Sequence, residues 1–144
     1  MFRGKIKSIF TIVWMTVLVS LSLNANPFLE AGEKYQIDPW LLYSIAKVES
    51  NVNPIAFNKN KNGTFDIGVM QINTIHKNTL IKNGGSLQDL WSPQTNIMYG
   101  AWVLRGCMNK HGYTTKAIDC YNGDKTGKYS QKVIAMYQSE SKKW

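Results

Sequence analysis

The chain has 144 residues and a net charge of +8, so its length allows one domain with a hydrophobic core of its own. Its lysines are spread at about one per turn or loop and do not form a stripe. This distribution excludes the usual basic nucleic-acid interface and is typical of a solvated surface.

The first 25 residues have the composition of a secretory signal peptide. Three basic residues, Arg3, Lys5 and Lys7, precede an apolar run over 9–23, and Ala25 is a small residue at a plausible cleavage point. The alternative is an uncleaved membrane anchor, but this run is shorter than the roughly 20 residues that a spanning helix needs. We therefore expect export to the periplasm, cleavage after Ala25, a single domain over residues 26–144, and no membrane contact after cleavage.

Start and stop signals predict mostly helices in the exported part. An N-cap residue followed by proline, at Asn26-Pro27, Asp38-Pro39 and Ser92-Pro93, is a strong helix start. The predicted helices cover about 26–35, 39–50, 71–82, 93–111, 114–122 and 127–138, with a short turn after Ser86.

One region departs from the helical pattern. Residues 58–63 are polar and end in Asn62-Gly63, a strong tight-turn signal, and residues 64–67 then alternate polar and apolar. This predicts a small β-hairpin before Gly68. The fold class is therefore mainly α (α+β), a helical domain with one small β-hairpin.

The two cysteines, Cys107 and Cys120, both lie in the exported part. An even number in an oxidising compartment favours a disulfide, with two free buried thiols as the alternative. No histidine cluster accompanies them, so neither a metal site nor a cofactor is expected.

Carboxylates are few, which narrows the search for a catalytic acid. Surface or capping roles suit Glu30, Glu33, Asp38, Asp89 and Glu140, which leaves Glu49, Asp66, Asp119 and Asp124. His76 and His111 have no Ser or Cys partner in a catalytic pattern and are expected on helix surfaces.

Glu49 ends an apolar helix face. Leu42, Ile45, Ala46 and Glu49 follow the i, i+3, i+4, i+7 spacing of one helical face. A carboxyl on such a face is partly desolvated, which raises its pKa and suits a proton donor for glycosidic cleavage. Alternatively, Glu49 marks the solvent edge of the stripe.

Four short motifs occur in order around this glutamate: Glu49-Ser50, the segment 68–73 (GVMQIN), Tyr121-Asn122-Gly123, and Tyr129 with Val133. Together they resemble the lysozyme-like lytic transglycosylases, the family of the soluble lytic transglycosylase catalytic domain. The chain is most similar to the small exported transglycosylases that accompany type III secretion and invasion systems. Conjugation and pilus systems use similar ones.

The resemblance implies a role for each matched residue. Glu49 would be the single catalytic acid and base that cleaves peptidoglycan between N-acetylmuramic acid and N-acetylglucosamine and leaves a 1,6-anhydro product. The implied substrate-binding residues are Ser50, Met70, Gln71, Tyr121, Asn122 and Tyr129, although Met70 could equally be core. Val133 and Tyr137 suit the core better than the site.

The sequence also departs from the family pattern. Cys120 replaces an alanine, which implies a disulfide, and Asp124 replaces a glycine, which puts one loop conformation and one sugar contact in question. Asp66 is an additional carboxylate, and lysozymes use a Glu and an Asp at this same separation. Asp66 could stabilise an oxocarbenium-like transition state, or it could be satisfied by backbone N–H groups, Lys59 or Lys61.

We expect an exported monomeric transglycosylase that opens the wall locally for a secretion or conjugation apparatus. Its positive charge suits peptidoglycan strands that carry peptide carboxylates. The alternatives are a lysozyme-type muramidase that uses Glu49 and Asp66, and a non-catalytic wall-binding scaffold.

Overall fold

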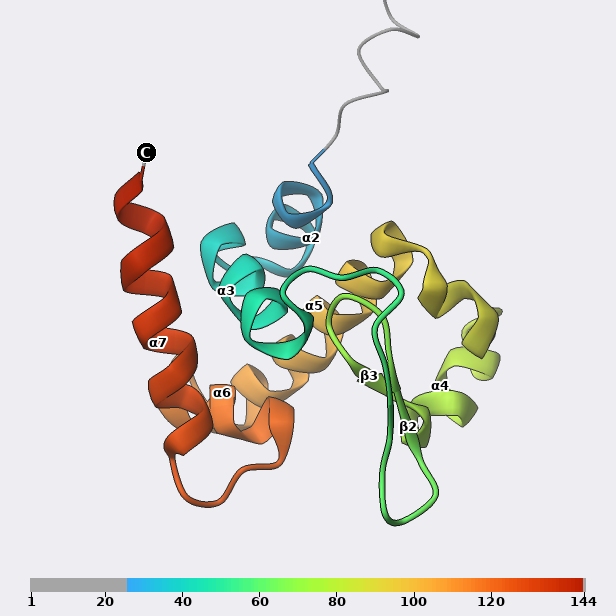
Figure 1. Ribbon diagram of the computed structural model, residues 1–144. Helices are drawn as coiled ribbons and strands as arrows, with labels where there is room; N and C mark the ends of the chain where they lie inside the picture. The colour runs from blue at the N-terminus through green and yellow to red at the C-terminus, as the bar shows by residue number, and fades with distance from the viewer. Residues whose placement is uncertain (1–25, 144) are drawn as a thin grey trace, which may run out of the picture.

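The computed structural model, which describes residues 26–143, is mainly helical, with a small β-sheet whose hairpin extends away from the helices (Figure 1). The signal-peptide prediction for residues 1–25 lies outside these residues. The helices are α2 (Pro27–Tyr35), α3 (Pro39–Ser50), α4 (Lys77–Lys82), α5 (Pro93–His111), α6 (Thr115–Asn122) and α7 (Lys128–Glu140). Short 3-10 helices cover η2 (Thr74–His76), η3 (Leu87–Trp91) and η4 (Ser141–Lys143). The mainly helical fold class is confirmed.

The predicted helix starts act as expected. The Asp38 side chain accepts a hydrogen bond from the Trp40 N–H at 2.8 Å, and Pro39 is the first residue of α3. Asn26 caps α2 through the Phe28 N–H at 2.9 Å, and Ser92 precedes Pro93 at the start of α5. These caps satisfy backbone donors that have no partner within the helix.

The apolar face of α3 forms part of the core, because Leu42, Ile45 and Ala46 are fully buried. Burial of a leucine or isoleucine side chain contributes about 1.5–3 kcal/mol. The helix packs against α7, while α5 packs against α2 and α6. No helix among residues 26–143 combines the length and the apolar character needed to cross a membrane.

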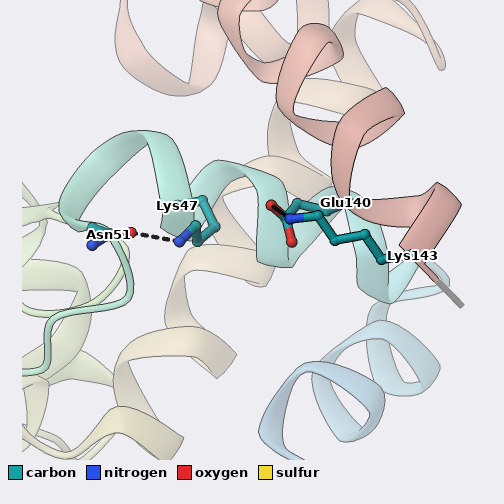
Figure 2. A network of polar contacts seen from close by, with 4 residues as sticks. All are labelled: Lys47, Asn51, Glu140 and Lys143. Carbon is teal, nitrogen blue, oxygen red and sulfur yellow. Dashed lines mark hydrogen bonds and ion pairs between the residues drawn. The ribbon is translucent and has the colours of Figure 1, made fainter.

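Two left-handed residues end α3. Asn51 and Val52 have φ angles of 55° and 61°, and their N–H groups bond the Lys47 and Ala46 carbonyls. The Lys47 ammonium donates to the Asn51 side chain at 2.5 Å, and Lys143 forms an ion pair with Glu140, the last residue of α7. Figure 2 draws both contacts. The chain therefore turns sharply directly after Glu49-Ser50.

The β-region contains three antiparallel strands, β1 (Phe57–Lys59), β2 (Phe65–Ile67) and β3 (Ile72–Asn73), in the order β1-β2-β3. The hairpin prediction is confirmed for β1 and β2. The prediction of a helix from residue 71 is wrong for its first half, where β3 and η2 lie. Gln71 has a φ of 49°, which interrupts a helix, and Ile72 pairs with Ile67.

A disulfide joins Cys107 of α5 to Cys120 of α6, with 5.8 Å between their Cα atoms. The predicted pairing is therefore confirmed. The bond fixes the last turn of α6 against the long helix α5, directly before Tyr121 and Asn122.

Candidate active site

A cleft of about 830 Å³ lies between the sheet, the end of α3 and the end of α6. Glu49 and Asp66 both line it, Glu49 from α3 and Asp66 from the middle strand β2. The structure therefore brings together the two carboxylates that sequence reasoning selected. Lys61 is the only lysine or arginine among the described residues that line the cleft.

Glu49 sits at the edge of the core. Burial raises the pKa of its carboxyl above the ordinary value, and the charge of Asp66 adds to this rise. Hydrogen bonds from Tyr129 and Asn122 act in the opposite direction but are outweighed. The net effect is a raised pKa, as the apolar face of α3 predicted.

Tyr129 holds Glu49 from the facing helix. Its hydroxyl donates to Glu49 Oε1 at 2.5 Å and links α7 to α3. Burial raises the pKa of the Tyr129 hydroxyl, so this group remains a donor at neutral pH.

The start of α7 is fixed by two other carboxylates. Asp124 accepts hydrogen bonds from the Tyr129 and Thr126 N–H groups, both at 2.8 Å, and these bonds lower the pKa of Asp124 to about 2. Asp119 accepts from the N–H and hydroxyl of Ser130 at 2.8 and 3.0 Å. Asp124, which departs from the family pattern, therefore caps a helix and positions Tyr129.

Asp66 lies in a row of polar side chains across the sheet. Asn58 and Asn73 are its direct partners on β1 and β3, so the three side chains share one face. Amide groups of Asn73, Asn60 and Asn58 donate to the Asp66 carboxylate at 2.7, 2.9 and 3.3 Å. The simpler alternative was that backbone N–H groups, Lys59 or Lys61 satisfy Asp66. The partners are instead these asparagine amides.

The turn after β2 is built around a buried amide. Asn96 of α5 is fully buried; it accepts from the Met70 N–H at 2.7 Å and donates to the Ile67 and Leu90 carbonyls at 2.8 Å. Gly68 has a φ of 76°, and a Cβ there would lie 2.4 Å from Asn96 Nδ2. Only glycine fits at this position.

Three predicted substrate contacts are absent from the cleft lining: Tyr129, whose hydroxyl bonds Glu49, and the pair Met70 and Ser50. Met70 is fully buried against Gly100, so its side chain belongs to the core. The Ser50 hydroxyl donates to the Val69 carbonyl at 2.7 Å, so it ties the end of α3 to the turn and is absent from the cleft lining. Both residues act on the geometry of the site from behind it.

Three predicted contacts do line the cleft: Gln71, Tyr121 and Asn122. Gln71 donates to the Gly68 carbonyl at 3.0 Å, and the Tyr121 hydroxyl donates to the Met70 carbonyl at 2.8 Å. Asn122 is exposed at the end of α6, beside Gly123. Of the two presumed core residues on α7, Val133 is buried, whereas the Tyr137 hydroxyl reaches Asp38 at 2.5 Å near the surface.

Sequence reasoning missed several lining residues. Asn60, Thr64 and Asn73 surround Asp66, and Ile75, His76 and Val103 form another part of the wall. Strand alternation could have placed Asn58 and Asp66 on one face, but β3 was not recognised. His76 is half-buried, and burial lowers the pKa of its imidazole.

The cleft therefore combines a half-buried acid, a hydrogen-bond donor that orients it, and a second carboxylate held by amides. An acid of raised pKa can protonate a leaving oxygen, and a facing carboxylate can stabilise positive charge. This arrangement is suited to cleavage of a glycosidic bond.

Comparison with known proteins agrees with this chemistry. The family model described as "Transglycosylase SLT domain" matches residues 26–143. The chain is 36% identical over 123 residues to "Invasion protein IagB" of Salmonella typhimurium, covering 83% of this chain and 74% of the relative. It is 40% identical over 94 residues to "Protein IpgF" of Shigella flexneri, covering 65% of this chain and 62% of the relative. It is 31% identical over 152 residues to "Peptidoglycan-binding-like protein" of Escherichia coli O157:H7, covering 94% and 89%.

The match to the family model spans all of the described residues, and the Salmonella typhimurium relative covers 83% of the chain. The chain therefore belongs to the SLT transglycosylase family and is a peptidoglycan lytic transglycosylase.

Proposed function

We propose that Glu49 is the catalytic acid and base of this transglycosylase and that the reaction forms a 1,6-anhydromuramyl product. The observation that carries the proposal is the raised pKa of a half-buried carboxyl that lines the cleft and accepts from Tyr129. The substrate is the β-1,4 bond between N-acetylmuramic acid and N-acetylglucosamine.

In the first step, the Glu49 proton passes to the glycosidic oxygen as the bond from that oxygen to C1 of the muramyl residue breaks. The muramyl 6-hydroxyl then attacks C1, and its proton returns to Glu49. The bond from C1 to oxygen 6 replaces the broken one, so no water is consumed. Glu49 ends in its starting protonation state.

Asp66 stabilises the positive charge that develops near C1 during this exchange. Support comes from its place on the cleft face of β2 and from three amide donors that suit a carboxylate. The carboxylate needs no proton transfer of its own. Its contribution is electrostatic.

Gln71, Tyr121 and Asn122 bind the sugars in this proposal, since all three line the cleft. Ser50 and Met70 support the turn behind these contacts. Tyr129 is a positioning residue because it acts through Glu49.

Export through residues 1–25 completes the proposal, because peptidoglycan lies outside the cytoplasmic membrane. The enzyme then acts in the periplasm and opens the wall for a secretion or conjugation apparatus. The name of one relative, an invasion protein, supports such a role. A reporter fused after residue 25 tests export: a cleaved, exported reporter supports it, and a reporter retained in the cytoplasm contradicts it.

A lysozyme-type muramidase is the second candidate, and the presence of Asp66 in the same cleft lining as Glu49 supports it. Mass spectrometry of murein digested by the protein separates the two reactions. Anhydromuramyl ends are expected, and exclusively reducing ends would establish hydrolysis. Glu49→Gln should abolish either product. If the wild type binds murein but releases neither product, the protein is a wall-binding scaffold.

A further inference from the structure

A second groove lies on another side of α5, between α2 and α4, and has a volume of about 520 Å³. The side chains used below are the aromatic Tyr99 and Trp102, the amides Asn83 and Gln94, and the carboxylate Glu30. We call this feature the α5 groove. None of its lining residues belongs to the catalytic cleft.

Three rings connect the α5 groove with the cleft. His76 lines the cleft, and its ring centroid lies 5.8 Å from Tyr99 and 6.4 Å from Trp102, in edge-on contacts. Tyr99 and Trp102 lie 5.0 Å apart and line the α5 groove. A polymer that leaves the cleft past His76 therefore meets an aromatic surface at once.

Trp102 is 37% exposed although it is a large aromatic residue on a helix that packs on two others. Exposed tryptophan faces commonly mark binding surfaces, because they offer a large apolar area that is rigid. Beside it, the Tyr99 hydroxyl is the only buried side-chain polar atom among residues 26–143 that lacks a hydrogen-bond partner. Such a group is unfavourable for folding alone, so it calls for an explanation.

We propose that the α5 groove binds a sugar residue of the same glycan strand, beyond the part that the cleft holds. The proposal rests on the proposed function, since it assumes that the cleft binds a glycan. The ring of Trp102 provides a face for the C–H groups of a pyranose, and the Asn83 amide provides hydrogen bonds for hydroxyl or N-acetyl groups.

The charges of the groove favour a sugar over the peptide part of peptidoglycan. No lysine or arginine is among the residues that line it, and Glu30, which accepts a hydrogen bond from Gln94, contributes negative charge. A carboxylate-bearing peptide would therefore be repelled, whereas a neutral sugar would not.

The test compares glycan strands of two lengths: a short oligosaccharide that only fills the cleft, and a long uncrosslinked strand. Trp102→Ala should raise KM for the long strand about three- to tenfold, which is the loss of one aromatic contact, and leave the short substrate unchanged. Phe57→Ala is the matched control, because Phe57 is 54% exposed and lines neither the cleft nor the groove. Equal effects of Trp102→Ala on both lengths, or no effect on either, would overturn the proposal.

Two further variants guard against a folding defect and against dependence on catalysis. Trp102→Phe keeps a ring and should restore most of the binding. Tyr99→Phe removes a hydroxyl that is buried and does not reach the groove surface, so it should leave binding of the long strand unchanged without lowering thermal stability. In a Glu49→Gln background, pull-down of long strands measures the groove without cleavage, so a failure of the proposed reaction is distinguishable from a failure of the groove. Unchanged retention in the Trp102→Ala variant would again reject the site.

Discussion

The Tyr129 hydroxyl lies 2.5 Å from Glu49 Oε1, and the two residues come from facing helices separated by 80 positions in the sequence. This contact makes the acid of the cleft dependent on the last long helix. The Asp124 carboxylate, which binds the Tyr129 N–H, extends the dependence to the loop before α7.

Tyr129→Phe should therefore impair the function of Glu49 as an acid while the aromatic ring stays in place. The lost hydrogen bond lowers the pKa of Glu49 in the wild type, so its loss raises that pKa further and moves the alkaline limb of the activity profile to higher pH. A misoriented acid should also reduce kcat roughly ten- to a hundredfold. Murein turnover against pH measures both effects. A lower rate with an unmoved alkaline limb would contradict this role.

Glu49→Gln should be more stable than the wild type at neutral pH. The pKa of Glu49 is raised from 4.5, so its proton contributes stability that is complete below about pH 4.5 and is lost as pH rises through the folded value. Glutamine is neutral at every pH, so the variant does not lose this stability as the pH rises. Urea unfolding at about pH 4 and about pH 8 should show a difference only at the higher pH. If the variant and the wild type have the same free energy of unfolding at both pH values, Glu49 is not desolvated.

The amides around Asp66 should matter for rate more than for binding. Asn60→Ala removes a donor 2.9 Å from Asp66, and Asn73→Ser removes the donor at 2.7 Å but keeps a cap for the Ile75 N–H. Each should lower kcat roughly tenfold with little change in KM, because the carboxylate is then less well held. Asn62→Ala, also in the cleft lining but without a bond to Asp66, is the control. If Asp66→Asn itself leaves the rate unchanged, Asp66 has no electrostatic role.

Gly68 and Gly63 provide a matched pair for the turn behind the site. Both have positive φ angles, 76° and 82°, but a Cβ on Gly68 meets Asn96 at 2.4 Å while one on Gly63 meets nothing within 4 Å. Gly63→Ala should cost only about 1 kcal/mol, the strain of the left-handed conformation. Gly68→Ala should cost on the order of 3 kcal/mol or more and reduce activity, since the turn must move. Thermal unfolding compares the two directly; similar losses would refute the steric reason.

The disulfide should contribute to both stability and activity. Reduction, or Cys107→Ser with Cys120→Ser, opens a loop with a sequence separation of 13 and should cost about 3 kcal/mol. Because Cys120 lines the cleft directly before Tyr121, the activity that remains should also fall. Activity per folded molecule, measured with and without reductant, tests this. A drop in stability alone would show that the bond does not position α6.

Much of the secondary structure could be predicted from local sequence signals. The N-cap and proline pairs before α2, α3 and α5 act on neighbouring backbone, so they predict those helices from a few residues. Likewise, the spacing of Leu42, Ile45 and Glu49 depends only on helical geometry. It therefore indicated both the buried face and the unusual environment of the acid.

The remaining features depend on contacts between distant segments. The short strand β3 exists because Ile72 pairs with Ile67 after the left-handed Gln71, which no periodicity over 71–82 could reveal. Ser50 and Met70 belong to the same sequence motifs as residues that line the cleft. However, Ser50 donates a hydrogen bond to the Val69 carbonyl and Met70 packs against Gly100, so neither side chain points into the cleft. The nature of the Asp66 partners likewise depended on the sheet register.

The groups that hold the two cleft carboxylates carry no charge. Tyr129 and Asn122 act on Glu49, and asparagine amides hold Asp66, so none of these interactions is an ion pair that dissolved salt can screen. The geometry of the cleft should thus be insensitive to ionic strength. Attraction of the anionic wall polymer depends instead on solvated lysines, which salt does screen. A change in ionic strength would then alter how often the enzyme meets its substrate, and leave each cleavage event the same.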